Sequence, residues 1–278
     1  MQPWTDVALP ALVGAAAGTH AATWGMYKDA PHEGFAWSTY LRSVLVGAGI
    51  APLVRLALGI PLAGAAGIVL LFGGTYAVER MVHEVYKTFV RRENQAKYAL
   101  PMALAVDGRV VRSHALRLVL GVVYVAAVAV LFAAIRGFER LTAPVRPGVL
   151  PIVLLGWAGG WVSALGSAWK GPPIEGFDLR KFFRIPVLAL VYSVLLAGLT
   201  SDYLRISVAA AGFTVATAET YRTLFFPSTP RGKFAGKPVL FPEQLRRRHY
   251  FVPLYVGISL GVVAAAALAF GSPREGLW

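Results

Sequence analysis

Two glutamates, Glu84 and Glu219, occupy matching places in the two halves of the chain, each just after a long apolar run. Each is followed three residues later by a base, Lys87 or Arg222, and residues three apart on a helix are neighbours. A carboxylate at the edge of a membrane is costly unless it is paired or solvated. We therefore expect either an interfacial ion pair or a binding place for a proton, a coupling ion or a cationic group.

The histidines His114 and His249 stand where the last apolar run of each half begins. Together with Glu84 and Glu219 they could form metal sites or a proton relay. No His-x-x-x-His or His-Glu-x-x-His spacing supports metal binding, so we predict no metal and no other cofactor.

A polar phrase is also written twice. Residues 27–35 read YKDAPHEGF, and residues 169–177, which begin 142 positions later, read WKGPPIEGF. We expect Pro31 and Pro173 to end the preceding helices, and Gly34 and Gly176 to permit unusual turns. The charged residues either fix a loop under the membrane or form the rim or gate of a binding site. They are Lys28, Glu33 and Arg42 in the first copy and Lys170, Glu175 and Arg184 in the second.

Further matches follow in the same order along the chain, which argues for an internal duplication. The phrase from Lys97 to Ala99 resembles the phrase from Lys233 to Ala235. Pairs of glycines four residues apart lie in the first helix of each half, and such pairs let two helices approach closely in lipid. We expect the two first helices to meet through these glycines, which are Gly14, Gly18, Gly156 and Gly160.

These residues must be positioned by segments that are almost free of charge. The chain is 56% hydrophobic and only 15% charged, against about 25% charged residues in an average soluble domain. A helix that crosses a membrane needs about 20 apolar residues, and eight runs approach that length. They cover residues 7–26, 43–58, 61–78, 115–135, 148–168, 185–199, 204–218 and 250–271.

We therefore predict an all-α, polytopic transmembrane protein with about eight spans in a single membrane domain. Residues 1–141 and 142–278 would form two four-helix repeats, and the even number of spans makes the repeats parallel. The hairpins 43–78 and 185–218 are short, and we favour full crossings over re-entrant turns. No base precedes Val7, so the first run is interpreted as a retained helix, not a cleaved signal.

The basic residues sort to one side of this arrangement. Every lysine lies in the alternate loops 27–42, 79–114, 169–184 and 219–249. The positive-inside rule places these loops in the cytoplasm and both termini outside the cytoplasmic (inner or plasma) membrane. The excess of 27 basic over 14 acidic residues has the same cause, and without a nucleic-acid motif we expect no nucleic-acid partner. Loop 222–249 mixes aromatic and basic residues, which suits anionic lipid headgroups or a specific phosphate site.

Three functions fit this pattern. The first is a transporter or lipid-handling permease whose substrate carries a phosphate or carboxylate and binds near the cytoplasmic mouth, between the repeats. The second is a structural or accessory subunit that binds partner membrane subunits or a second copy of the chain. The third is a membrane enzyme on a lipid-linked substrate, which we disfavour because no Gly-x-Ser-x-Gly elbow and no cysteine is present; we predict no catalytic residue. The candidate substrate-binding or gating residues are Lys28, Glu33, Arg42, Glu84, Tyr86, Lys97, His114, Lys170, Glu175, Arg184, Glu219, Tyr221, Lys233 and His249.

Overall fold

The computed structural model describes residues 3–142, 148–226 and 232–278, without the side chains of residues 3–5, 166–170, 172, 175 and 181. Long helices make up most of it. They are α1 (Pro3–Glu33), α2 (Trp37–Leu58), α3 (Ala65–Val85), α4 (His114–Thr142), α5 (Val149–Lys170), α7 (Leu179–Ala197), α8 (Tyr203–Leu224) and α10 (Val252–Phe270). The short elements are η1 (Tyr86–Val90), η2 (Gln95–Lys97), β1 (Ala105–Val106), β2 (Arg109–Val110), α6 (Pro172–Glu175), η3 (Gly232–Phe234), α9 (Gln244–Arg247) and η4 (Arg248–Phe251).

The all-α class is confirmed, and each of the eight expected apolar runs overlaps one long helix. Among the described residues, four helical stretches are long and apolar enough to cross a membrane: Trp37–Leu58, Ala65–Val90, His114–Thr142 and Gln244–Phe270. Two more stretches, Val149–Leu165 and Phe182–Ala197, are apolar but shorter. These helices are typical of a membrane protein, while the number of eight spans stays a prediction.

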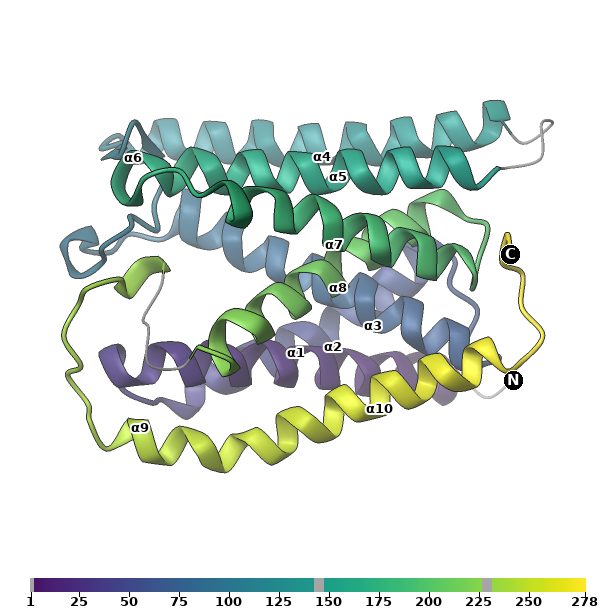
Figure 1. Cartoon of the computed structure of the whole chain (residues 1–278), viewed down its shortest axis with the longest axis horizontal. Helices are drawn as coiled ribbons and strands as arrows, with labels where there is room; N and C mark the ends of the chain where they lie inside the picture. The colour runs from purple at the N-terminus through teal and green to yellow at the C-terminus, as the bar shows by residue number, and fades with distance from the viewer. Residues whose placement is uncertain (1–2, 143–147, 227–231) are drawn as a thin grey trace.

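The two chain ends lie at one end of the molecule, and α6 and α9 lie at the opposite end (Figure 1). We call these the terminal end and the loop end. The long helices run between the two ends. The helix connections that contain the expected basic loops therefore lie at the loop end.

Local chemistry explains several helix boundaries. Gly59 ends α2 with a φ of 60°, and its N–H donates to Leu56 O at 3.2 Å, which is a common glycine-based helix stop. At the start of α8 the Asp202 carboxylate accepts the N–H of Arg205 at 2.8 Å, as an N-cap does. Gly34 and Gly176 both have a positive φ, of 79° and 81°, in the region that other residues rarely adopt.

Pro31 does not end α1, which continues to Glu33; that prediction was wrong. A proline inside a helix removes the N–H that would bond to the carbonyl four residues earlier, here that of Tyr27. The guanidinium of Arg248 supplies the missing donor, with Nη1 3.0 Å from Tyr27 O. A loop residue from far along the chain thus stabilises the last turn of α1.

The core lies where α3 crosses α8. A methyl group added to Gly212 would come within 1.9 Å of Gly73 O, so the two backbones touch without side chains between them. Tyr76, Leu71 and Ile206 are fully buried around this crossing. The peripheral helices α4 and α10 instead expose apolar residues along most of their length.

The paired glycines bring together the first and second helices of each half. Gly14 and Gly18 press on the backbone of α2, and Gly156 and Gly160 press on α7. The expectation that the two first helices meet through these glycines was wrong, because a glycine pair indicates a close approach but not its partner. A Cβ added at each glycine would lie 2.2 Å from Gly47 O (Gly14), 2.2 Å from Ser43 O (Gly18), 1.9 Å from Ser193 Oγ (Gly156) and 2.6 Å from Pro186 Cα (Gly160).

Ion pairs and backbone contacts join several helices at the terminal end. Arg136 of α4 lies 2.7 Å from Asp202 beside α8. Arg205 of α8 lies 3.2 Å from the same carboxylate and donates to Leu58 O, at the end of α2, at 2.8 Å. On α1, Asp6 pairs with Arg55 of α2 at 3.0 Å. These contacts connect α1, α2, α4 and α8 at the end away from the basic loops.

Candidate anion-binding cavity

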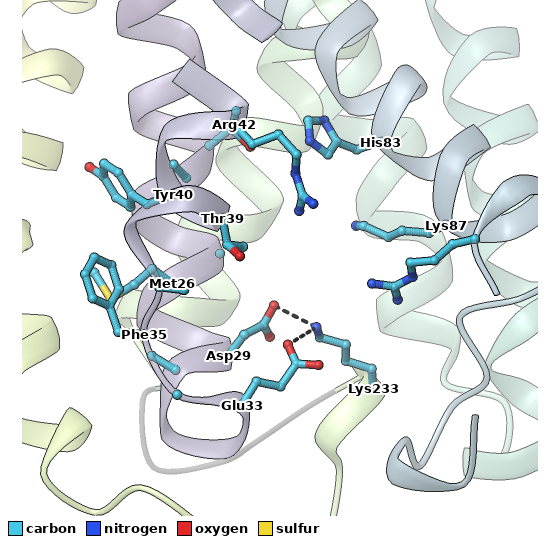
Figure 2. Close-up of a pocket in the computed structure, with 18 of the residues that line it drawn as sticks. Met26, Asp29, Glu33, Phe35, Thr39, Tyr40, Arg42, His83, Lys87 and Lys233 are labelled. Atoms are coloured by element: carbon cyan, nitrogen blue, oxygen red, sulfur yellow. Dashed lines mark hydrogen bonds and ion pairs between the residues drawn. The ribbon is translucent and has the colours of Figure 1, made fainter. Parts of the chain in front are cut away.

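A cavity of about 330 Å³ opens at the loop end among α1, α2 and α3. Its lining mixes small apolar residues with charged ones, and Figure 2 shows the charged side chains directed into one space. The cavity lies among helices of the first half and is closed by a loop from the second; it does not lie between the halves. The lining includes Gly25, Asp29, Glu33, Arg42, His83, Lys87, Arg91 and Lys233.

Small residues on one face of α1 make room for the cavity. Ala22, Gly25, Asp29 and Glu33 follow the spacing of three and four residues that places side chains on one helix face. Nothing lies within 4 Å of a Cβ built at Gly25. The α1 wall is therefore hollow where the opposite wall carries long basic side chains.

The basic wall comes from two helices. Arg42 projects from α2, and His83 and Lys87 project from α3 and its continuation η1, toward the same space (Figure 2). Lys87 Nζ is 3.0 Å from Glu84 Oε1. Arg42 forms no ion pair with any residue that the structure describes. A guanidinium without a carboxylate partner is free to bind an anion.

The acidic wall is held by lysines from two loops. Lys233 Nζ lies 3.0 Å from Asp29 and 2.9 Å from Glu33, and Lys97 lies 3.3 Å from Glu33. Burial by itself raises the pKa of Glu33, but the charge and hydrogen bond of Lys233, followed by those of Lys97, outweigh it and lower that pKa. For Lys233 burial opposes the charge, while Asp29 and Glu33 prevail and raise its pKa. Glu33 and Lys233 therefore stay charged near neutral pH.

A second cluster of charges adjoins this wall. Lys97 pairs with Glu93, which also lies 2.6 Å from Arg91. Burial raises the pKa of Glu93, and hydrogen bonds from Lys97 and Tyr98 lower it by more, so the net shift is downward. The Tyr98 hydroxyl lies 2.9 Å from Glu93 Oε2 and 3.2 Å from Glu33 Oε1. The loop after α3 is thus tied to the end of α1.

The loop that carries Lys233 also contacts α1 through an aromatic stack and through backbone hydrogen bonds. Phe234 stacks on His32 with ring centroids 4.7 Å apart. The N–H groups of Leu240 and Phe241 donate to Pro31 O at 2.9 and 3.0 Å. Lys233 O accepts the N–H of Ala99 at 2.7 Å, so the two matched lysine phrases contact each other. We call residues 232–241 the cap of the cavity.

Deeper in α3 lies a buried carboxylate that the sequence analysis did not single out. Glu79 is fully buried, and its Oε2 accepts from Arg80 Nε at 2.7 Å. His83 Nδ1 lies 3.0 Å from Glu79 Oε1. The spacing Glu-Arg-x-x-His, with the ends four residues apart, is the signal that could have found this pair. Arg91 was also missed as a lining residue.

The predicted site residues are only partly brought together. Glu33, Arg42 and Lys233 line the cavity, and Lys97 contacts Glu33. Lys28 of α1 lies 3.6 Å from Glu219 of α8, which also pairs with Arg222 at 3.1 Å. This ion-pair cluster, which is separate from the one around Glu93, joins α1 to α8 beside the cavity. The side chains of Lys170 and Glu175 lie outside the described residues.

The remaining candidates lie elsewhere. Glu84 is half exposed, and Tyr86 is exposed. The Arg184 guanidinium lies over the ring of Tyr221. His114 lies near Val90 O and Arg92, and His249 lies near the Tyr27 hydroxyl. Among the described residues no group of three His, Asp or Glu side chains could hold a metal ion.

Comparison of the chain with protein-family models, with characterised proteins and with solved structures gives no match.

Proposed function

We propose that the chain is an integral membrane transporter or lipid-handling permease that takes the phosphate or carboxylate group of its substrate into the cavity at the loop end. The convergence of Arg42, His83 and Lys87 on one space carries this proposal. The lining holds five Arg and Lys residues against three Asp and Glu residues. Because the unpaired charge is a guanidinium, the wall favours anions with two or more oxygens.

The membrane setting supports the same reading. The lysines cluster in the connections at the loop end, so the positive-inside rule would make that end cytoplasmic and both termini external. The cavity would then open at the level of the inner headgroups. Anionic lipids gather at that leaflet, and either a lipid phosphate or a soluble anion from the cytoplasm could reach the basic wall.

We further propose that residues 1–141 and 142–278 are two parallel repeats of four spans. The glycine contacts support it: Gly14 with Gly47 and Ala51 in one half corresponds to Gly156 with Ala189 and Ser193 in the other, all at one offset in sequence. The positive φ of Gly34 recurs at Gly176. In this arrangement the axis would pass through the crossing of α3 and α8. The charged residues that line the polar cavity come from the first repeat, except for Lys233, which comes from the second.

The test is anion binding to the detergent-purified protein. Isothermal titration calorimetry with sulfate, inorganic phosphate and a short-chain phosphatidic acid covers soluble and lipid-borne anions. We expect Arg42→Gln to weaken binding of the preferred anion about 10- to 100-fold, because a hydrogen bond to a charged group contributes about 1.5–3 kcal/mol. Arg109→Gln is the matched control, since Arg109 is exposed on β2 and outside the cavity.

A second variant tests the space itself. Gly25→Leu should fill the cavity without disturbing the fold, because a side chain at Gly25 meets open space. Gly49→Leu on α2 is equally unhindered but lies outside the cavity lining. Loss of anion binding in the first variant alone supports the cavity as the site, and equal binding in both rejects it. Flux of the bound anion in proteoliposomes then separates a transporter from a binding protein.

Purification in mild detergent addresses the alternative role as an accessory subunit. The exposed apolar faces of α4 and α10 would be covered by lipid in a transporter and by a partner in a complex. A stoichiometric partner chain that co-purifies, together with no anion flux, would favour the accessory role over the one proposed.

A further inference from the structure

The described wall of the cavity contains a histidine, the side-chain type whose charge can change near neutral pH. His83 lines the cavity, and its Nδ1 lies 3.0 Å from both the backbone O and the carboxylate Oε1 of Glu79, one turn earlier on α3. Both side chains are buried. A carboxylate at Nδ1 orients the imidazole and stabilises its protonated form. Figure 2 shows the ring over the same space into which Arg42 and Lys87 project.

We propose that His83 is a proton-binding residue that couples proton uptake to anion binding in this cavity. The inference rests on the proposed function, because it needs an anion in the cavity. With the site empty, His83 shares its wall with several cations, and like charges in one site repel each other. An anion in the cavity offsets that repulsion, so it favours protonation of His83.

The coupling must work in both directions. If an anion raises the proton affinity of His83, a proton on His83 raises the anion affinity by the same factor. Glu79 provides the charge that keeps the proton in a buried place, and Arg80 holds that carboxylate at 2.7 Å. The proton and the anion would then enter the cavity together, with no change in net charge for a monoanion.

Other charged groups face the same region, and several of them keep their charge over the pH range of the experiment described below. Glu33 and Glu93 have lowered pKa values, and Lys233 and Lys97 have raised ones, so these four do not change charge between pH 6 and pH 8. The charged groups around the cavity are Asp29 and Glu33 from α1, Arg42 from α2, Glu79, Arg80 and Lys87 from α3 and η1, Arg91, Glu93 and Lys97 from the following loop, Lys233 from the cap, and Glu219 from α8.

The experiment measures protons taken up when sulfate binds. Sulfate keeps its charge from pH 6 to pH 8, so every proton that moves belongs to the protein or the buffer. Titration of the purified protein in two buffers of different ionisation enthalpy gives the number of protons bound per sulfate. We expect net uptake, and a sulfate dissociation constant that rises by up to about tenfold per pH unit above the imidazole pKa, the limit for one linked proton.

Two variants test whether His83 binds the proton that is taken up with sulfate. His83→Gln should bind sulfate with no proton uptake and with an affinity independent of pH. His114→Gln should retain the uptake, since His114 contacts Val90 O and Arg92 and does not line the cavity. Uptake that persists in His83→Gln, or sulfate binding to the unmodified protein without uptake, would overturn the coupling and leave the anion site intact. If sulfate, inorganic phosphate and the short-chain phosphatidic acid all fail to bind, the anion cavity itself is refuted. The measurement on the unmodified protein decides the case even if a variant does not fold.

Discussion

Replacement of Gly14 by alanine is the sharpest test of how the first two helices are held. The added Cβ would lie 2.2 Å from Gly47 O and 2.5 Å from the Cβ of Ala51. Cβ atoms practically never approach another heavy atom within 3.0 Å. The clash is with the backbone of α2, which has no alternative rotamer, so the two helices must separate by about 0.8 Å or more.

The cost follows from that separation. A gap of 0.5–1 Å removes about a quarter to a half of the attraction between facing atoms, and overpacking of this kind costs about 1–3 kcal/mol. We expect a fall of about 4–8 °C in the melting temperature for a loss of about 2 kcal/mol in a chain of this size. Gly18→Ala meets Ser43 O in the same interface. The double variant should therefore cost less than the sum of the two, because one displacement relieves both clashes.

The assay is thermal unfolding in detergent, followed by intrinsic tryptophan fluorescence and by loss of the monodisperse peak in gel filtration. Gly49→Ala on α2 is the control, since its Cβ meets nothing within 4 Å. Alanine in a helix interior is about 0.5–1 kcal/mol better than glycine, so the control should be unchanged or slightly more stable. An unchanged melting temperature in Gly14→Ala, or strictly additive costs in the double variant, would refute the backbone contact.

Three further predictions concern the core, the cap and the orientation. Gly212→Ala, whose Cβ would lie 1.9 Å from Gly73 O, should lower the folded yield more than Gly14→Ala, because it forces apart the central pair α3 and α8; gel filtration measures the yield. Lys233→Met should destabilise the protein by about 1–3 kcal/mol at neutral pH. Because folding lowers the pKa of Glu33, its ion pair stabilises the fold above the ordinary carboxyl range, and this stabilisation is lost as pH falls through the lowered pKa. Because folding raises the pKa of Lys233, its stabilisation of the fold is lost only as pH rises above the ordinary lysine range. The difference in melting temperature between Lys233→Met and the unmodified protein should therefore shrink toward both extremes of pH, and a constant difference would contradict the ion-pair account. Single cysteines at Glu243 and Ser272, both exposed, in a chain that has no other cysteine, should react with an impermeant maleimide from opposite sides of the membrane; labelling of both from one side would reject the proposed topology.

The elements could be predicted because a helix in lipid is defined by a run of apolar residues of sufficient length. The helix ends were less predictable, since they depend on contacts across the chain. The run expected at 43–58 begins six residues earlier in α2, where Trp37 and Tyr40 pack against Phe251. Pro31 was expected to break α1, but a distant arginine provides the donor that proline lacks. No local pattern contains that information.

Part of the candidate site could be identified from the sequence. Glu33, Arg42 and Lys233 belong to matched polar phrases, and matching drew attention to them. Glu79 and His83 have no match in the second half, so an approach based on repetition passed over the most buried carboxylate of the cluster. Glu84 received that attention instead, and its side chain is half exposed beside Lys87. Burial is a property of three-dimensional packing, which the spacing of charges along one helix does not reveal.

The contacts at the terminal end set how the molecule can move. Arg205, Asp202 and Arg136 join α2, α4 and α8 far from the cavity. At the cavity end, α1 is held by charges and stacking from the cap and by contacts from the loop after α3. A 22-residue helix such as α2 is about 33 Å long. Rotation about its fastened end by about 4° would carry the tip, and Arg42 near it, through about 2 Å, a lever length that follows from the helical rise. The fold thus resembles tweezers joined at the terminal end, where a small rotation of α2 about its fastened end displaces its other end most.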